Sequence, residues 1–160
     1  MVRKIAILLM TLVFSSIAIA DAGDKTVMLS GKQLSEKEPN KISIKALEAD
    51  FTLQTVEIYN PWEKRKEIYT GIWVTDLIKK YGQGAHSLTL TAIDNYQVTL
   101  KDEDWQNLRI LLATKVNGQY IDVKNKGPMR VVFPDYNAAD KRYELSLPKW
   151  LWMIKQLEFN

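Results

Sequence analysis

The stretch Lys126-Gly127-Pro128-Met129-Arg130-Val131-Val132-Phe133-Pro134 decides how this chain folds. Its apolar part, Met129 to Phe133, predicts a buried strand, and Pro134 closes that strand because proline cannot donate to a sheet ladder. Arg130 interrupts the apolar run. A buried arginine needs an acceptor, which is either an internal acid or a bound anion. Arg130 is therefore a candidate ligand contact.

One amphipathic helix stands out among short strands in the rest of the chain. From Ile72 to Tyr81, apolar residues recur at helical spacing, and Gly82 is suited to end the helix. For Lys41 to Ala49 the pattern leaves a strand and a helical turn both open. The other predicted strands are Thr26–Ser30, Phe51–Ile58, Ser87–Ile93, Tyr96–Leu100, Arg109–Val116, Gln119–Val123 and a last one ending at Phe159. The sequence predicts a single α+β domain.

Turn residues divide these segments. Asn117-Gly118 is a strong hairpin signal because both residues tolerate positive φ, and Asp94-Asn95 predicts a second hairpin. Asn60-Pro61 is expected to open a loop that runs to Tyr69. Asp102 is expected to cap a helical turn through Trp105. Residues 135–146 form a predicted polar loop.

The first 20 residues read as an export signal. Arg3 and Lys4 precede an uncharged apolar run, and Ala18-Ile19-Ala20 fits a small-residue cleavage site. We therefore expect residues 21–160 to be an exported, soluble domain. Without Arg3 and Lys4 it carries 20 bases against 19 acids. With no arginine-rich stripe, nucleic acid is not expected as a partner.

The absence of cysteine limits the chemistry. The 160 residues contain no cysteine and one histidine, His86. Thiolate metal sites and cysteine nucleophiles are excluded, and a lone histidine cannot form a zinc site. We expect His86 to lie in a surface loop. No catalytic residue and no metal ligand is predicted.

From Gly71 to Phe159 the chain resembles the molybdopterin-binding domain of the sulfite oxidase fold. The resemblance rests on five pieces in order: Gly71-Ile72-Trp73-Val74-Thr75-Asp76-Leu77-Ile78, Asp94-Asn95-Tyr96, Asn117-Gly118, Gly127-Pro128-Met129-Arg130 with Pro134, and the tryptophan-rich end before Glu158. In the enzymes of that family, a cysteine in the loop before the helix ligates molybdenum. The corresponding stretch here is Tyr59-Asn60-Pro61-Trp62, so no molybdenum is expected.

The chain is also similar to small periplasmic pterin-binding proteins of this fold. Those proteins act beside membrane enzymes that make or degrade cyclic di-GMP, and they change the partner's activity with pterin status. The residues that fit the pattern are Thr55, Pro61-Trp62, Asp94-Asn95-Tyr96, Lys126-Gly127-Pro128 and Trp152. Arg130 departs from it, because those relatives often have an aromatic residue there and the enzymes an arginine. This leaves open whether the ligand is a bare pterin or one with an anionic group.

A pterin is a flat, polar bicycle with a guanine-like edge, so its site needs aromatic faces and an acceptor for paired N–H donors. Asp94 or Asp135 is the candidate acceptor, and Arg130 is a candidate planar fork for a carbonyl or phosphate oxygen. Packing is the alternative for the aromatic residues, and turn formation is the alternative for Asp94. The candidate aromatic faces are Trp62, Tyr96, Tyr136 and Trp152.

The function expected from this resemblance is that of a pterin sensor for the periplasmic part of a membrane signalling enzyme, with a crevice near Trp62 and Arg130. One alternative is a molybdopterin-dependent oxidoreductase-like enzyme that lacks the cysteine ligand. Another is an interaction protein without a small ligand, in which exposed aromatic residues grip the partner.

Overall fold

Two sheets organise residues 22–160, the part of the chain that the computed structural model describes. In spatial order, the first sheet consists of β2 (Lys41–Ser43), β1 (Thr26–Ser30), β10 (Ile154–Phe159), β5 (Ser87–Ala92) and β6 (Gln97–Lys101). The second consists of β3 (Gln54–Asn60), β4 (Arg65–Trp73), β7 (Leu111–Val116) and β8 (Gln119–Tyr120), with β9 (Arg130–Val132) also paired to β7. The predicted signal peptide, residues 1–20, lies outside the described residues.

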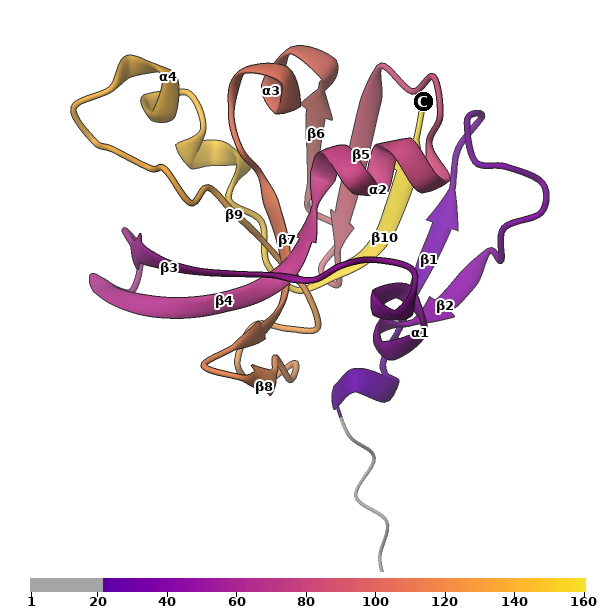
Figure 1. Cartoon of the computed structure of the whole chain (residues 1–160), viewed down its shortest axis with the longest axis horizontal. Helices are drawn as coiled ribbons and strands as arrows, with labels where there is room; N and C mark the ends of the chain where they lie inside the picture. The colour runs from indigo at the N-terminus through magenta and orange to yellow at the C-terminus, as the bar shows by residue number, and fades with distance from the viewer. Residues whose placement is uncertain (1–21) are drawn as a thin grey trace, which may run out of the picture.

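Short helices connect the strands (Figure 1). They are α1 (Ile44–Ala49), α2 (Val74–Tyr81), α3 (Asp102–Asn107) and α4 (Lys141–Glu144), with 3-10 turns η1 (Ala22–Asp24) and η2 (Leu147–Lys149). The predicted α+β class is confirmed, and both hairpins, around Asp94-Asn95 and Asn117-Gly118, form as expected. Within residues 22–160, no helix has the length and apolar character needed to cross a bilayer.

The predicted loop from Asn60 to Tyr69 is wrong, because β4 already begins at Arg65. β3 and β4 form a long antiparallel hairpin that extends away from the first sheet (Figure 1). The charged run Lys64-Arg65-Lys66-Glu67 concealed the strand. On the outward face Lys66 pairs with Glu57 at 2.8 Å, and the inward Glu67 is buried among polar partners.

Two further predictions need correction. The helix begins at Val74, because Ile72 and Trp73 are the last residues of β4. Asp102 does not cap α3: Lys101 occupies the N-cap position, and its backbone N–H donates to the Asp104 carboxylate at 2.7 Å. The reason is that the helix starts at Asp102 itself, one residue earlier than an Asp102 cap would require.

The α2 helix packs its apolar face on the first sheet. Its Val74, Leu77 and Tyr81 are buried, and the Tyr81 ring lies 6.4 Å from that of Phe159 on β10. A Cβ at Gly82 would lie 2.4 Å from the Phe159 ring, so the residue that ends the helix is also fixed by this close approach.

Candidate functional site

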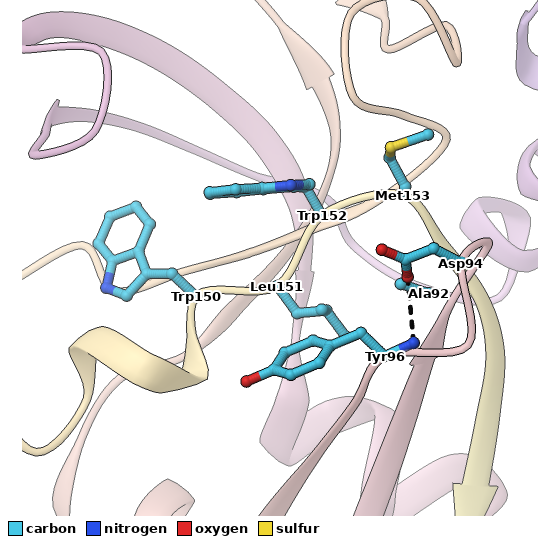
Figure 2. Close-up of a pocket in the computed structure, with 7 residues that line it drawn as sticks. All are labelled: Ala92, Asp94, Tyr96, Trp150, Leu151, Trp152 and Met153. Atoms are coloured by element: carbon cyan, nitrogen blue, oxygen red, sulfur yellow. Dashed lines mark hydrogen bonds between the residues drawn. The ribbon is translucent and has the colours of Figure 1, made fainter.

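A small cleft of about 110 Å³ lies where the β5–β6 turn meets the segment that leads into β10. The segment is tied to β9 and its flank, because Val131 N donates to Leu151 O at 2.7 Å and Ile154 N donates to Met129 O at 3.3 Å. One side of the cleft is therefore a segment held by β9 of the second sheet, and the other side is a turn of the first sheet. Its lining residues, drawn in Figure 2, are Ala92, Asp94, Tyr96, Trp150, Leu151, Trp152 and Met153.

Three of the predicted site residues, Asp94, Tyr96 and Trp152, come together in this cleft. Figure 2 shows the Trp152 and Tyr96 rings on opposite sides of it, with the Asp94 carboxylate on a third side. Asp94 Oδ1 accepts from Tyr96 N at 3.0 Å, which fixes the turn, and Oδ2 has no hydrogen-bond partner among residues 22–160. Tyr96 is 57% exposed. The arrangement offers two aromatic faces and one carboxylate oxygen that remains free to accept.

Trp152 is held from outside the cleft. The Trp62 ring meets it edge to face, with ring centroids 6.0 Å apart, and Lys126 Nζ lies over it at 5.1 Å from the centroid. Lys126 also pairs with Glu63 at 2.7 Å. This hydrogen bond and the charge of Lys126 lower the pKa of Glu63. The hairpin tip is thus joined to the aromatic side of the cleft.

Trp62 itself does not line the cleft and is 51% exposed. Its loop is held by Asn60, whose Oδ1 accepts from Trp62 N at 2.9 Å and from Glu63 N at 3.2 Å. The buried Asn60 amide donates in turn to Glu67 at 3.0 Å and to Tyr69 Oη at 2.9 Å. The loop therefore holds Trp62 half-exposed at the surface, and hydrogen bonds of the buried Asn60 side chain fix the loop.

Arg130 belongs to the same polar network and is 9% exposed. Its guanidinium donates to Tyr69 Oη at 3.3 Å and to the Asn125 carbonyl, and its Nε has no partner in the described part of the chain. We expected Arg130 to contact either an internal acid or a bound anion, but its two acceptors are neutral oxygens. The acid Glu67 is reached only through Tyr69, whose hydroxyl donates to it. Arg130 also lines two crevices of about 150 and 160 Å³.

Glu67 is the buried acid of this network. Burial by itself would raise its pKa, but hydrogen bonds from Tyr69, Asn60 and Arg65 outweigh burial and lower the pKa below the ordinary 4.5. Burial and the bond to Glu67 raise the pKa of Tyr69 to about 12. Both groups therefore stay in their ordinary charge states near neutral pH, with Glu67 ionised and Tyr69 neutral.

We predict that Glu67 makes stability depend on pH in the acid range. Because its pKa is lower in the folded state, its contribution is present above about pH 4.5 and is lost as the pH falls through the folded value. The difference in unfolding free energy between wild type and Glu67→Gln should shrink as the pH falls from about 5 to about 3. Urea unfolding at each pH measures it, and a constant difference would contradict the assignment.

The structure places Asp135 and Tyr136 away from the cleft lining. Asp135 accepts from the Arg109 guanidinium, which lowers its pKa, and Arg109 lies over the Trp73 ring. Tyr136 packs edge to face on Tyr143 and Trp150. The roles of both residues as ligand contacts stay predictions, but their side chains already have protein partners.

Sequence reasoning missed four residues of the cleft, which are Ala92, Trp150, Leu151 and Met153. Trp150 does pack on Phe133, at 5.8 Å between ring centroids, and it also lines the cleft. No local signal marks Met153, because the feature that distinguishes it is a backbone φ of +59°.

The residues present do not fit a protein-bound molybdenum. The sequence has no thiolate, and within residues 22–160 no cluster of three or more His, Asp or Glu side chains could hold a metal ion. His86 is exposed as expected and contacts Asp102 at 3.1 Å, at the end of β5 opposite the cleft. The cleft, by contrast, has aromatic faces and a carboxylate oxygen, which are groups that a pterin ring can contact.

Comparison with known proteins agrees with the fold. A search of solved structures finds similarity to the sulfane dehydrogenase SoxCD from Paracoccus pantotrophus, with a TM-score of 0.57 and 15% sequence identity. The match covers 88% of this chain and 39% of the SoxCD chain, so this chain spans well under half of that protein. No curated protein matches. The family model for the oxidoreductase molybdopterin-binding domain matches residues 16–159, and this chain therefore belongs to that family.

Proposed function

We propose that this chain is a periplasmic pterin-binding protein without molybdenum catalysis. The carrying observation is the cleft in which Trp152, Tyr96 and the free oxygen of Asp94 meet, in a chain that has no cysteine. The ring of a pterin would stack on Trp152, and its paired N–H donors would face Asp94. Pockets that enclose drug-sized ligands hold roughly 300–1,000 Å³. The cleft, at about 110 Å³, is smaller than this, so a pterin bound there would keep part of its bicycle in solvent.

We further propose that pterin status is passed to the periplasmic part of a membrane enzyme of cyclic di-GMP metabolism. The similarity of the residues around Trp62, Asp94 and Trp152 to small periplasmic pterin-binding proteins supports this partner. The contact between Trp152 in the cleft and half-exposed Trp62 supports this proposal, because a ligand that moves the Trp152 ring would also change the position of Trp62 at the surface. Exposed tryptophan is a frequent anchor of protein interfaces.

Titration of residues 21–160 with reduced pterins tests the binding. Because Trp152 lines the cleft and Trp62 contacts Trp152, we expect tryptophan fluorescence to be quenched, with a dissociation constant well below millimolar. Replacing Trp152 by alanine should weaken binding by roughly 1–3 kcal/mol, because the variant loses the ring on which the pterin would stack. An absence of binding below millimolar for every pterin tried would remove the proposal, and circular dichroism of the variant would reveal a loss of fold instead.

The alternative is an oxidoreductase-like enzyme that lacks the cysteine ligand. Family membership favours it, together with the similarity to a dehydrogenase. Here Arg130 would meet an anionic group of the cofactor, since its Nε has no partner within residues 22–160. Elemental analysis of protein from a molybdenum-replete host separates the two functions. Stoichiometric metal favours the enzyme, and a metal-free protein with a co-purifying pterin favours the sensor.

A further inference from the structure

The cleft is lined by four consecutive residues, Trp150, Leu151, Trp152 and Met153. A regular extended chain cannot do this, because successive side chains point to opposite sides. The segment is therefore not a regular strand. Its left-handed residue is Met153, which has a φ of +59°.

Left-handed backbone is unusual at a long, non-glycine residue. It persists only where the surroundings over-determine it, and such residues gather at functional sites. Asn95 and Lys126, beside the cleft, are also left-handed, but each lies in a turn, with φ values of +70° and +64°. Met153 lies instead just before β10, where the ladder between β10 and β5 has an irregular register.

Both peptide groups of Met153 are fixed by parts of the chain that surround the cleft. Its N–H donates to Lys126 O at 3.1 Å, and its carbonyl accepts from Ile93 N at 2.9 Å. Lys126 is the residue whose ammonium group lies over Trp152, and Ile93 precedes Asp94. One residue thus joins the turn that carries the carboxylate to the segment that carries the aromatic face.

We infer that Met153 is a positioning residue for the pterin site: its left-handed backbone, rather than its side chain, presents Trp152 opposite Tyr96. The inference rests on the proposed function for the identity of the ligand. According to this inference, the shape of the cleft depends on a residue that no local sequence pattern identifies. Substitutions at Met153 should then act on binding according to the backbone conformation that they permit.

The test compares Met153→Ile, Met153→Leu and Met153→Gly, with 7,8-dihydrobiopterin as the probe. A β-branched side chain resists positive φ, so Met153→Ile should bind about five- to thirtyfold more weakly. Leucine keeps an unbranched Cβ and a similar volume, and glycine adopts positive φ freely. Both of these variants should bind much more tightly than Met153→Ile. If Met153→Gly loses as much affinity as Met153→Ile, the side chain rather than the backbone matters, and the inference is overturned.

A control variant makes the same backbone change outside the cleft. Asn117 has φ +50° in the β7–β8 turn and does not line the cleft. Asn117→Ile should lower the melting temperature and leave the dissociation constant at the wild-type value. Equal losses of affinity in Asn117→Ile and Met153→Ile would show a general effect on the fold and would overturn the positioning role.

Fluorine NMR of protein labelled with 5-fluorotryptophan provides a readout without ligand. The Trp152 resonance, assigned through Trp152→Phe, should shift or broaden in Met153→Ile and keep its position in Met153→Gly and Asn117→Ile. If Met153→Ile does not fold, Met153→Val replaces it, because valine is smaller and is also β-branched. Failure of wild-type protein to bind any pterin refutes the proposed function alone, since this resonance still decides the role of Met153. An unchanged resonance in the isoleucine or valine variant overturns that role.

Discussion

Replacing Glu48 by alanine is expected to destabilise the folded protein by about 3 kcal/mol, the lower end of the cost of breaking a buried ion pair. The Glu48 side chain on α1 is 7% exposed and accepts from three groups of the second sheet. These are Thr114 Oγ1 at 2.5 Å, Lys115 Nζ at 2.7 Å and Tyr120 Oη at 2.7 Å. Without the carboxylate, a lysine whose side chain is 19% exposed loses its only anionic partner within residues 22–160.

The matched control for this prediction is Glu57→Ala on β3. Glu57 pairs with Lys66 at 2.8 Å, but both side chains are largely exposed, so its removal should change stability far less. Thermal and urea unfolding measure both variants, and about 3 kcal/mol corresponds to a fall of roughly 6–12 °C in melting temperature for a domain of this size. Equal losses of stability in the two variants would show that the burial of Glu48 does not strengthen its contacts between α1 and the second sheet.

Local patterns were sufficient for the elements whose signals are local. Asn117-Gly118 forms the β7–β8 turn with positive φ at both residues, and the apolar run around Arg130 is the buried strand β9. The apolar face of α2 was visible at helical spacing, although its first residue was not. In each case the deciding interactions lie within a few residues of one another.

The β4 strand could not be predicted in this way. Its inward face carries Glu67 and Tyr69, which are stable there only because Asn60 and Arg130 supply partners from other strands. A polar residue that is buried by distant partners has the same local pattern as a polar residue in a loop. The charged sequence therefore favoured the wrong element.

The candidate site divides along the same line. Asp94 was a candidate because its carboxylate suits a pterin edge, and Tyr96 was a candidate because a flat heterocycle needs an aromatic face. Asp135 met the same chemical criterion, and only the tertiary fold shows that Arg109 accompanies its carboxylate. The contribution of Met153 depends on a backbone angle and two hydrogen bonds between distant segments, for which sequence offers no pattern.

Replacing Asp94 by asparagine is expected to weaken the binding of a reduced pterin by about ten- to a hundredfold, the loss of a charge-assisted hydrogen bond of roughly 1.5–3 kcal/mol. The asparagine Oδ1 can still accept from Tyr96 N, so the turn and the melting temperature should be preserved. The second oxygen, however, becomes an NH2 group that faces the N–H donors of the ligand. The change therefore alters recognition while it keeps the shape of the cleft.

Asp135→Asn is the matched control, because sequence offered both aspartates as the acceptor and only Asp94 lines the cleft. Calorimetric titration of the two variants and the wild type should give a large loss for Asp94→Asn and none for Asp135→Asn. The reverse result would place the guanine-like edge beside Arg109 and Tyr136, outside the cleft. Equal small losses of affinity would mean that neither carboxylate accepts a hydrogen bond from the pterin. The ring would then be held by stacking on Trp152 alone.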